Sequence, residues 1–174
     1  MSDTATATQT VNRQFRLYHP KNDGNGAASK FELRLDTKAK YPEYLLFWTA
    51  AKQIPSDDDN AKFDWDNGVV IKLDTPDIGD LLAVLKGYKL AVGPEPKEGQ
   101  KPSIFHKNAS GNTSLTFSAE FNNKDRLAYY AMRLANKRNK DNVVTEAKHV
   151  VSIQEAMVLE VLLTKALHKF YGLD

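Results

Sequence analysis

The chain has 174 residues, of which 41% are apolar and 26% are charged, as is usual for a soluble globular protein of one domain. It contains no cysteine, which excludes a disulfide framework and zinc sites built on thiolates. No apolar run approaches the ~20 residues that a membrane-spanning helix needs. Residues 1–12 are polar and Thr-rich and have no apolar segment, so they are predicted to be a disordered tail rather than a secretory signal.

The net charge of +2 is unevenly distributed along the sequence. Residues 57–80 contain eight acidic and two basic residues, whereas residues 101–149 contain nine basic and four acidic residues. Within eight positions that hold no acid, the sequence places Arg133, Lys137, Arg138 and Lys140. A solvated surface is one interpretation of such a run, and a polyanionic partner is the other.

The first half of the chain predicts four strands and a helix. Apolar and polar residues alternate at 15–18, 30–36, 44–53 and 69–73, which is the pattern of half-buried strands. Turn-forming residues separate these strands at 21–26, 55–60 and 66–68. A helix follows, with Thr75 as the expected N-cap, Pro76 at the first helical position and Gly87 at the end.

The second half repeats this layout after a linker predicted at 91–102. Strands are predicted at 103–107, 113–121, 127–135 and 149–151, and the pattern at 143–146 is weaker. The residues of 127–135 include several helix formers, but Tyr129-Tyr130 and the place in the pattern favour a strand. The prediction is therefore one α+β domain at 13–174, with two four-stranded antiparallel sheets and a ββββα unit at about 13–90 and again at about 103–174.

The last helix is the best defined element of the sequence. Ser152 and Glu155 form a capping box at its start, and Gly172 is placed to end it. One stripe suited to covering a core consists of Ala156, Leu159, Leu163, Ala166, Leu167 and Phe170. The opposite side carries Met157, Val158, Val161 and Leu162. A helix that is apolar on both sides is buried on both, either within its own domain or, as we predict, against another subunit.

Sequence motifs of catalysis are missing from the chain. It has no phosphate-binding GK[ST] loop, no G-x-G-x-x-G and no G-x-S-x-G. Its four histidines do not stand at metal-ligand spacing, and the acidic run 57–60 lacks the central Gly and terminal Glu of an EF-hand loop. We therefore expect a binding protein rather than an enzyme, with no cofactor and no metal.

Aromatic and basic residues alternate on several predicted strands. Exposed rings stack nucleic-acid bases at about 1–3 kcal/mol each, while Lys and Arg follow the phosphates. For any single ring, burial in the core is the simpler interpretation. The candidates for nucleic-acid contact are Tyr44, Trp48 and Lys52 on one strand, Phe105 and Lys107 on a second, and Tyr129, Arg133, Lys137, Arg138 and Lys140 on and after a third.

Several short sequence motifs follow one another along the chain in a characteristic order. They are KFDW at 62–65, VIKL at 70–73, DIGDLL at 77–82, IFHK at 104–107, LTF at 115–117, VSIQEA at 151–156 and FYG at 170–172. With the two-unit layout, they resemble the Whirly family and its relatives, which share a fold with the transcriptional coactivator positive cofactor four. The start, YHP at 18–20 before a Gly-containing loop, is similar to bacterial and phage proteins of this fold. The resemblance covers nearly all of the chain after about Gln14.

This resemblance implies two antiparallel sheets packed against helices, and homotetramers assembled through the helices. It also implies sequence-tolerant binding of single-stranded DNA between the sheets of neighbouring subunits, in the cytoplasm of a bacterial or phage-infected cell. Plant Whirly proteins carry a Lys-Gly-Asn-Lys-like element used in higher-order assembly. Here the corresponding residues 25–30 keep only Gly26 and Lys30, so neither assembly beyond a tetramer nor that element's role in DNA binding is expected.

Three functions remain open from the sequence. The first is non-enzymatic binding of single-stranded DNA through the basic and aromatic strand residues. The second keeps the fold and takes RNA as the partner, since relatives of this fold bind guide RNA. The third is a protein-interaction or structural module whose basic residues form a solvated surface.

Overall fold

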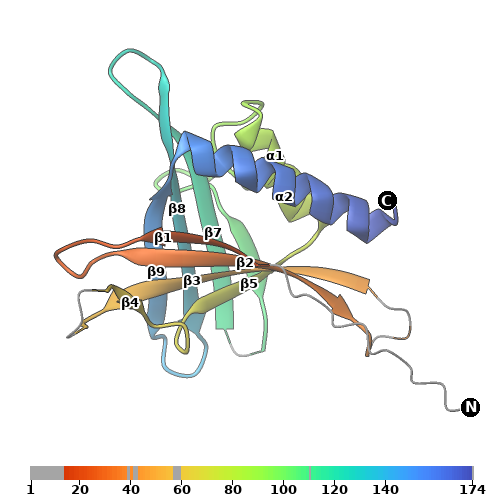
Figure 1. Cartoon of the computed structure of the whole chain (residues 1–174), viewed down its shortest axis with the longest axis horizontal. Coiled ribbons are helices and arrows are strands. Elements are labelled where there is room, and N and C mark those ends of the chain that lie inside the picture. The colour runs from red at the N-terminus through yellow and green to blue at the C-terminus, as the bar shows by residue number, and fades with distance from the viewer. Residues whose placement is uncertain (1–13, 39, 41–42, 57–59, 110, 174) are drawn as a thin grey trace, which may run out of the picture.

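Figure 1 shows the computed structural model of the chain, which describes residues 14–38, 40, 43–56, 60–109 and 111–173. The predicted tail at 1–12 and the centre of the predicted acidic loop lie outside these ranges. Two antiparallel sheets and two helices make up the described part, in the predicted order of four main strands and a helix, repeated once. The α+β prediction is therefore confirmed. Within the described ranges, no helix is long and apolar enough to cross a membrane.

The first sheet contains four main strands and one short addition. Its strands are β1 (Gln14–His19), β2 (Ala27–Asp36), β3 (Glu43–Ile54), β4 (Lys62–Phe63) and β5 (Val69–Leu73). The main order is β1-β2-β3-β5, and the two-residue β4 pairs with the end of β3. The addition of β4 was not predicted, since two residues are too few for an alternating pattern to be seen.

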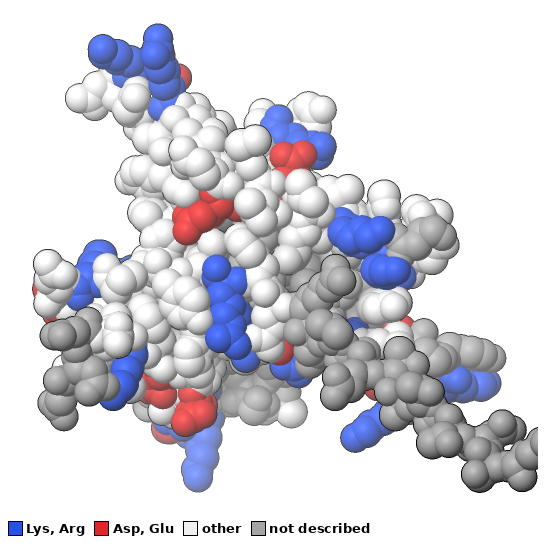
Figure 2. All heavy atoms as spheres, viewed as in Figure 1, with Lys and Arg blue, Asp and Glu red and all other residues white. Residues whose placement is uncertain are grey.

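The second sheet has four strands in sequence order. They are β6 (Ile104–Lys107), β7 (Gly111–Phe121), β8 (Leu127–Arg138) and β9 (Val144–Val151). The helix formers in β8 do not prevent a strand, as predicted. The two segments expected at 143–146 and 149–151 form the single strand β9. The hairpin between β7 and β8 projects beyond the rest of the molecule (Figure 1), and its tip carries the basic side chains seen at the upper left of Figure 2.

The core lies between the two sheets. Alternate residues of β3 and β8 point into it, and Leu46, Trp48, Met132 and Leu134 are almost completely buried there. The Trp48 ring contacts both layers, with its centroid 4.4 Å from that of Phe31 in the first sheet and 6.2 Å from that of Phe117 in the second. Removing a ring of this size from a core costs about 3–5 kcal/mol, so this contact is a major contribution to the stability of the domain.

Both helices lie on the same side of the sheets (Figure 1). The first, α1 (Thr75–Leu85), is capped by Asp74 in a capping box with Asp77, so the prediction of Thr75 as N-cap is wrong by one residue. Both residue types can cap a helix, and the extended backbone after β5 places Asp74 at the junction. The second, α2 (Ile153–Tyr171), has the predicted Ser152–Glu155 capping box and a left-handed Gly172 at its end.

The core side of α2 agrees with the predicted stripe. Ala156, Leu159, Leu163 and Ala166 are buried, and Leu167 and Phe170 are partly buried against the same core. An ion pair of 2.9 Å between Lys86 Nζ and Glu160 Oε1 joins the end of α1 to the middle of α2. The helices thus form one layer over the end of the sheets.

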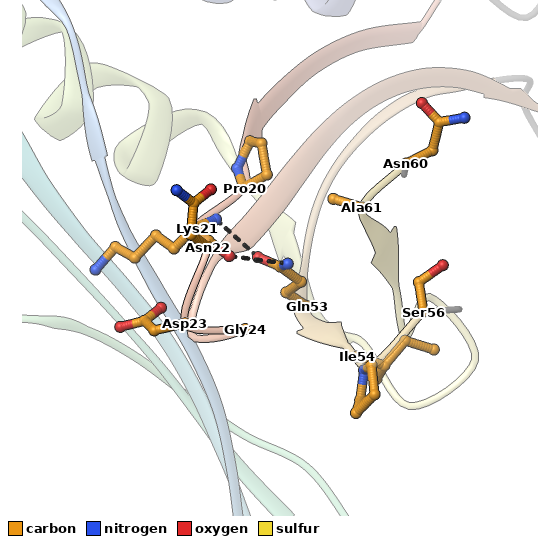
Figure 3. Close-up of a pocket in the computed structure, with 11 residues that line it drawn as sticks. Pro20, Lys21, Asn22, Asp23, Gly24, Gln53, Ile54, Ser56, Asn60 and Ala61 are labelled. Carbon is orange, nitrogen blue, oxygen red and sulfur yellow. Dashed lines mark hydrogen bonds between the residues drawn. The ribbon is translucent and has the colours of Figure 1, made fainter. Parts of the chain in front are cut away.

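The loop 20–26 between β1 and β2 is held by one side chain of β3. Gln53 Oε1 accepts hydrogen bonds from the backbone N–H groups of Lys21 (2.8 Å) and Gly26 (3.2 Å), and its Nε2 donates to the Lys21 carbonyl (3.1 Å), as Figure 3 shows for Lys21. A hollow of about 720 Å³ lies between this loop and the segment after β3. A Cβ on Gly26 would lie 2.3 Å from Gln53 Oε1 and 2.5 Å from the His19 carbonyl oxygen, so only glycine fits.

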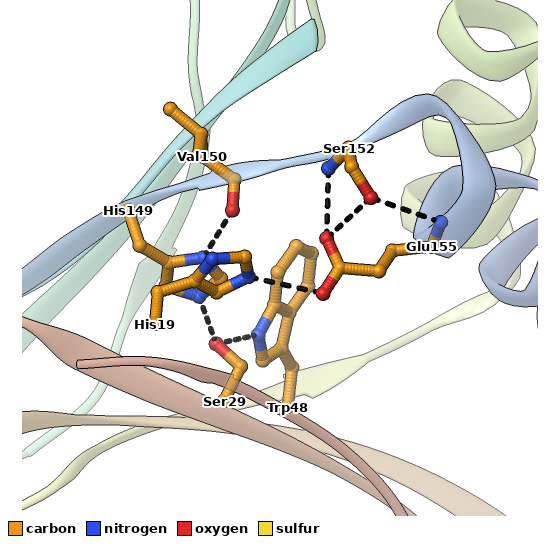
Figure 4. A network of polar contacts seen from close by, with 7 residues as sticks. All are labelled: His19, Ser29, Trp48, His149, Val150, Ser152 and Glu155. Carbon is orange, nitrogen blue, oxygen red and sulfur yellow. Dashed lines mark hydrogen bonds and ion pairs between the residues drawn. The ribbon is translucent and has the colours of Figure 1, made fainter. Parts of the chain in front are cut away.

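A chain of hydrogen bonds crosses from the first sheet to the second (Figure 4). Trp48 Nε1 donates to Ser29 Oγ (3.0 Å), which lies 2.7 Å from His149 Nε2, and His149 Nδ1 lies 2.7 Å from the Val150 carbonyl oxygen. A carbonyl oxygen can only accept, so Nδ1 carries the proton and the Ser29 hydroxyl donates to Nε2. Neutral His149 therefore satisfies every member of the chain.

The imidazole of His149 is held in this neutral form by its surroundings. Burial lowers its pKa from 6.5 to about 4, and the neighbouring His19 adds to this, while the hydrogen bond to the Val150 carbonyl and the charge of Glu155 act in the opposite direction. The two imidazole rings stack with centroids 4.8 Å apart. His19 Nε2 lies 3.2 Å from Glu155 Oε1 without forming a hydrogen bond.

We expect stability to fall as the pH drops below 6.5. There the unfolded chain protonates His149 while the folded protein resists protonation until about pH 4, so the contribution is complete above pH 6.5 and is lost by about pH 4. The pKa difference corresponds to about 3 kcal/mol in the free energy of unfolding. Urea unfolding at a series of pH values measures it. His149→Gln should have a shallower pH dependence, and an unchanged slope in this variant would contradict the assignment.

Gly26→Ala should lower the free energy of unfolding by about 1–3 kcal/mol, because a Cβ collides with the His19 carbonyl and with Gln53. Gly79→Ala is the matched control. Gly79 lies in α1, and a Cβ added there would meet no atom of another element within 4 Å, so the same substitution should stabilise by about 0.5–1 kcal/mol. Chemical denaturation of the two variants should show shifts of opposite sign, and shifts of the same sign would refute the close-contact explanation.

Candidate nucleic-acid interface

The outward face of the second sheet is hollowed into an open groove of about 850 Å³. Side chains that point away from the core form rows across the strands, and the central row consists of Thr116 on β7, Arg133 on β8 and Lys148 on β9. We call this hollow the sheet-two groove. Its lining includes His19, Lys21, Lys101, Phe105, Ser114, Thr116, Ser118, Tyr129, Arg133 and Lys148.

The walls of the groove come from distant parts of the chain. Lys101 and Phe105 line it from the segment that leads into β6 and from β6 itself. At the other side, beyond β9, it is lined by His19 and Lys21, at the end of β1 and in the loop held by Gln53. The groove therefore crosses the sheet from one edge strand to the other, roughly perpendicular to the strands.

Two exposed rings stand on this face. The exposed fractions are 52% for Phe105 and 41% for Tyr129. Phe105 on β6 pairs with Ser114 on β7, which pairs with Ala135 on β8. The row of Phe105 is therefore six residues from Tyr129 along β8, which corresponds to about 20 Å at the rise of a strand. Arg133 lies between the two rows. The face thus alternates an aromatic ring, a cation and a second ring.

Basic side chains surround Glu146 on β9 beside the groove, and a second carboxylate, Glu120, lines the groove itself and accepts a hydrogen bond from Ser118 Oγ at 2.8 Å. Arg133 Nε donates to Glu146 Oε2 at 2.7 Å. This hydrogen bond lowers the pKa of Glu146, and the charges of Arg133, Lys148 and Lys52 act in the same direction against the effect of burial. Glu146 is therefore ionised at neutral pH, and three cations share its one negative charge. The excess is positive.

The predicted group of Tyr44, Trp48 and Lys52 does not form one exposed face. Trp48 has no exposed surface, so the prediction that it stacks on bases is wrong. Alternation correctly placed the three on one side of β3, but that side faces the core. Tyr44 is half-buried at the far end, where Lys169 Nζ lies 5.9 Å from its ring centroid. Lys52 is exposed beyond the core and is close enough to Glu146 to affect its pKa.

The remaining predicted residues lie on the second sheet. Lys107 and Lys137 share a row with Asn112, two residues along the strands from the row of Phe105. Arg138 pairs with Asp141 at 2.9 Å, and Lys140 is exposed in the turn between β8 and β9. The structure thus extends the basic surface from the groove toward that end of the sheet.

Several groove residues were not singled out from the sequence. Lys148 was missed because β9 was divided into two segments, although Glu146, Lys148 and Val150 alternate with Ala147, His149 and Val151 in the sequence. Lys21 and Lys101 lie in loops, where no periodicity indicates which way a side chain points. Only the three-dimensional arrangement brings these three cations to one groove.

One group of possible metal ligands occurs among the described residues. Oxygen or nitrogen atoms of Asp74, Asp77 and His106 lie within 4.8 Å of one another. In the capping box, Asp77 Oδ2 accepts from the backbone N–H of Asp74 and Asp74 Oδ1 accepts from that of Asp77, and Asp77 Oδ2 lies 2.9 Å from His106 Nε2. Burial raises the pKa of Asp77, which the charge of His106 partly offsets. The group serves to join β6 to the start of α1.

The fold is shared with known structures, although the sequence is not. No protein-family model matches the chain, and no curated protein matches it in sequence. The structure of WHY1 from Arabidopsis thaliana superposes with a TM-score of 0.68 at 15% identity, over 92% of this chain and 86% of that one. Trypanosoma brucei MRP1/MRP2 superposes with a TM-score of 0.62 at 16% identity, over 94% and 89%.

A third similar structure is a guide RNA-binding protein complex bound to its guide RNA. It has a TM-score of 0.60 at 16% identity, over 91% of this chain and 92% of that one. At these identities the likeness establishes the arrangement of the elements. The chain therefore has a Whirly-like fold.

Proposed function

We propose that this protein binds single-stranded nucleic acid in the sheet-two groove and catalyses no reaction. The observation that carries the proposal is the row Thr116, Arg133 and Lys148, which lies between two exposed rings on an open face. Phosphates are neutralised by the cations, and bases stack on Phe105 and Tyr129. Lys107, Lys137, Arg138 and Lys140 extend the phosphate contacts toward the end of the sheet.

The proposal takes single-stranded DNA as the ligand. RNA is the alternative, and the similar structure that contains a bound guide RNA favours it. Hydroxyl groups of Ser114, Thr116 and Ser118 line the groove and can contact either backbone. Competition between DNA and RNA oligonucleotides of matched sequence separates the two. If the protein instead binds only other proteins and its cations form a solvated surface, it should retain neither the DNA nor the RNA oligonucleotide.

We further propose that copies of the chain assemble through the exposed side of α2. Met157, Val158 and Val161 are 65%, 49% and 70% exposed, an apolar stripe that a second copy would cover. The predicted contact Leu162 is partly buried against its own core, so it contributes least. A closed oligomer, with the tetramer as the expected form, repeats this contact by symmetry.

Binding should weaken steeply with salt, because each phosphate contact releases counterions. Fluorescence anisotropy with labelled oligo-dT at low and high salt measures this. The double variant Lys137→Gln and Lys148→Gln should reduce the magnitude of the logarithmic salt slope by about 1.4, at about 0.7 for each lost contact to a single strand. Lys38→Gln, on the β2–β3 connection, is the control. Wild-type protein that fails to bind at low salt would refute the proposed function.

Val161→Glu should lower the oligomeric state while the protomer stays folded, since a charge at the centre of an apolar contact is costly to bury and harmless when exposed. Light scattering gives the solution mass, and circular dichroism reports the fold. Thr37→Glu adds the same charge at an exposed position of the β2–β3 connection, outside α2, and should leave the mass unchanged. A Val161→Glu variant of wild-type mass would show that assembly does not use this side.

A further inference from the structure

The outward face of the first sheet carries a cluster of rings that the sheet-two groove does not use. Tyr18 lies with its ring centroid 5.7 Å from that of Phe63 and 6.4 Å from that of Trp65, and the last two are 6.4 Å apart. Tyr18 is 47% exposed, and Phe63 and Trp65 are half-buried. We call these three residues the sheet-one platform.

The strands explain why the rings gather on this side. Tyr18 pairs with Ala28, which pairs with Ala51, so two small residues lie beside it in one row and leave space for large rings. Phe63 lies in the short β4, which pairs with the end of β3, and Trp65 follows two residues later. Leu17, the preceding residue of β1, points into the core instead. The platform is therefore separate from the main core.

Cations border the platform. Lys30 Nζ lies 5.7 Å from the Trp65 ring centroid, and Arg16 Nη1 donates to the Tyr18 hydroxyl at 3.2 Å. Arg34 and Lys72 belong to the same face, by alternation along β2 and β5. A cation beside an exposed ring fits a ligand that combines a planar base with a phosphate.

The nearby acids are largely engaged within the protein. Burial raises the pKa of Glu32, but its hydrogen bonds with Lys30 and Arg34 outweigh this and lower it overall, so Glu32 is ionised and paired. Asp64 accepts hydrogen bonds from the Asn67 side chain and backbone. Asp66 is exposed in the same turn. Arg16 and Lys30 are thus the cations nearest the rings, and Asp36 and Glu43 lie on the same face beyond Arg34, at the far end from the platform.

We propose that the sheet-one platform is a second stacking site for bases of the same single-stranded nucleic acid, an inference that rests on the proposed function. The groove ends at His19 and Lys21, and Tyr18 is the next residue along β1 but points to the opposite side. A single-stranded nucleic acid that leaves the groove over Lys21 meets the platform after it passes the loop 20–26. Each protomer then holds more nucleotides than the groove alone accommodates.

Intrinsic fluorescence tests this directly, because the chain has two tryptophans and only one can meet a ligand. Trp48 is fully buried, whereas Trp65 is half-exposed on the platform. Stacking of a base on an indole quenches its emission. During titration with a long labelled oligo-dT, tryptophan emission should fall in step with the rise in anisotropy, and Trp65→Phe should abolish the fall while binding persists.

The outcomes separate the two proposals. Anisotropy that reports binding without quenching, or quenching that persists in Trp65→Phe, overturns the platform and leaves the groove intact. No anisotropy change at low salt overturns the proposed function, and the platform with it. Thermal unfolding of the variant checks that the fold is retained.

Oligonucleotide length gives an independent measurement. Tyr18→Ala should weaken binding of a long oligonucleotide by roughly 5- to 100-fold, the effect of losing one stacked base, and should leave a short one that fills only the groove unchanged. Tyr18→Phe keeps the ring and should bind as wild type. Tyr88→Ala, an 81% exposed ring at the end of α1, is the control. If Tyr18→Ala lost equal affinity for the long and the short oligonucleotide, or lost affinity for neither, the platform would be ruled out.

Discussion

The contact of Trp48 with both sheets is the constraint on which the rest of the structure depends. Its ring lies against Phe31 on one side and Phe117 on the other, and its N–H begins the hydrogen-bond chain through Ser29 to His149. Apolar contact sets the distance between the sheets, and the directional hydrogen bonds set their relative position. The groove is lined by β7, β8 and β9 of one sheet and by the β1–β2 connection of the other, so its shape follows from this contact.

The local features of the fold could be predicted from the sequence because their chemistry is local. The Ser152–Glu155 capping box, the left-handed Gly172 and the buried stripe of α2 depend on residues a few positions apart. The bounds of β5 follow from strict alternation over a short run. Alternation also grouped Tyr129, Arg133 and Lys137 on one face of β8, which is the outward face of the second sheet.

The remaining features depend on contacts between distant residues. Alternation tells which residues of β3 share a face, but the second sheet, which covers that face, begins about 50 residues later in the sequence. Trp48 was therefore assigned to the surface although it belongs to the core. The cations at Lys21 and Lys101 come from loops, and β4 is defined only by its pairing with β3. The contact of Tyr18 with Phe63 and Trp65 could not be predicted from the sequence either, because Tyr18 lies more than 40 positions from both.

The hydrogen bond between Ser29 and His149 joins residues 120 positions apart. Contacts of such long range form late, because the chain must close a large loop before they contribute any stability. During synthesis, the groove wall at His19 and Lys21 is made first and remains without its floor until β9 has emerged. A chain that ends before β9 lacks residues that line the groove, so the binding proposed above requires the C-terminal half.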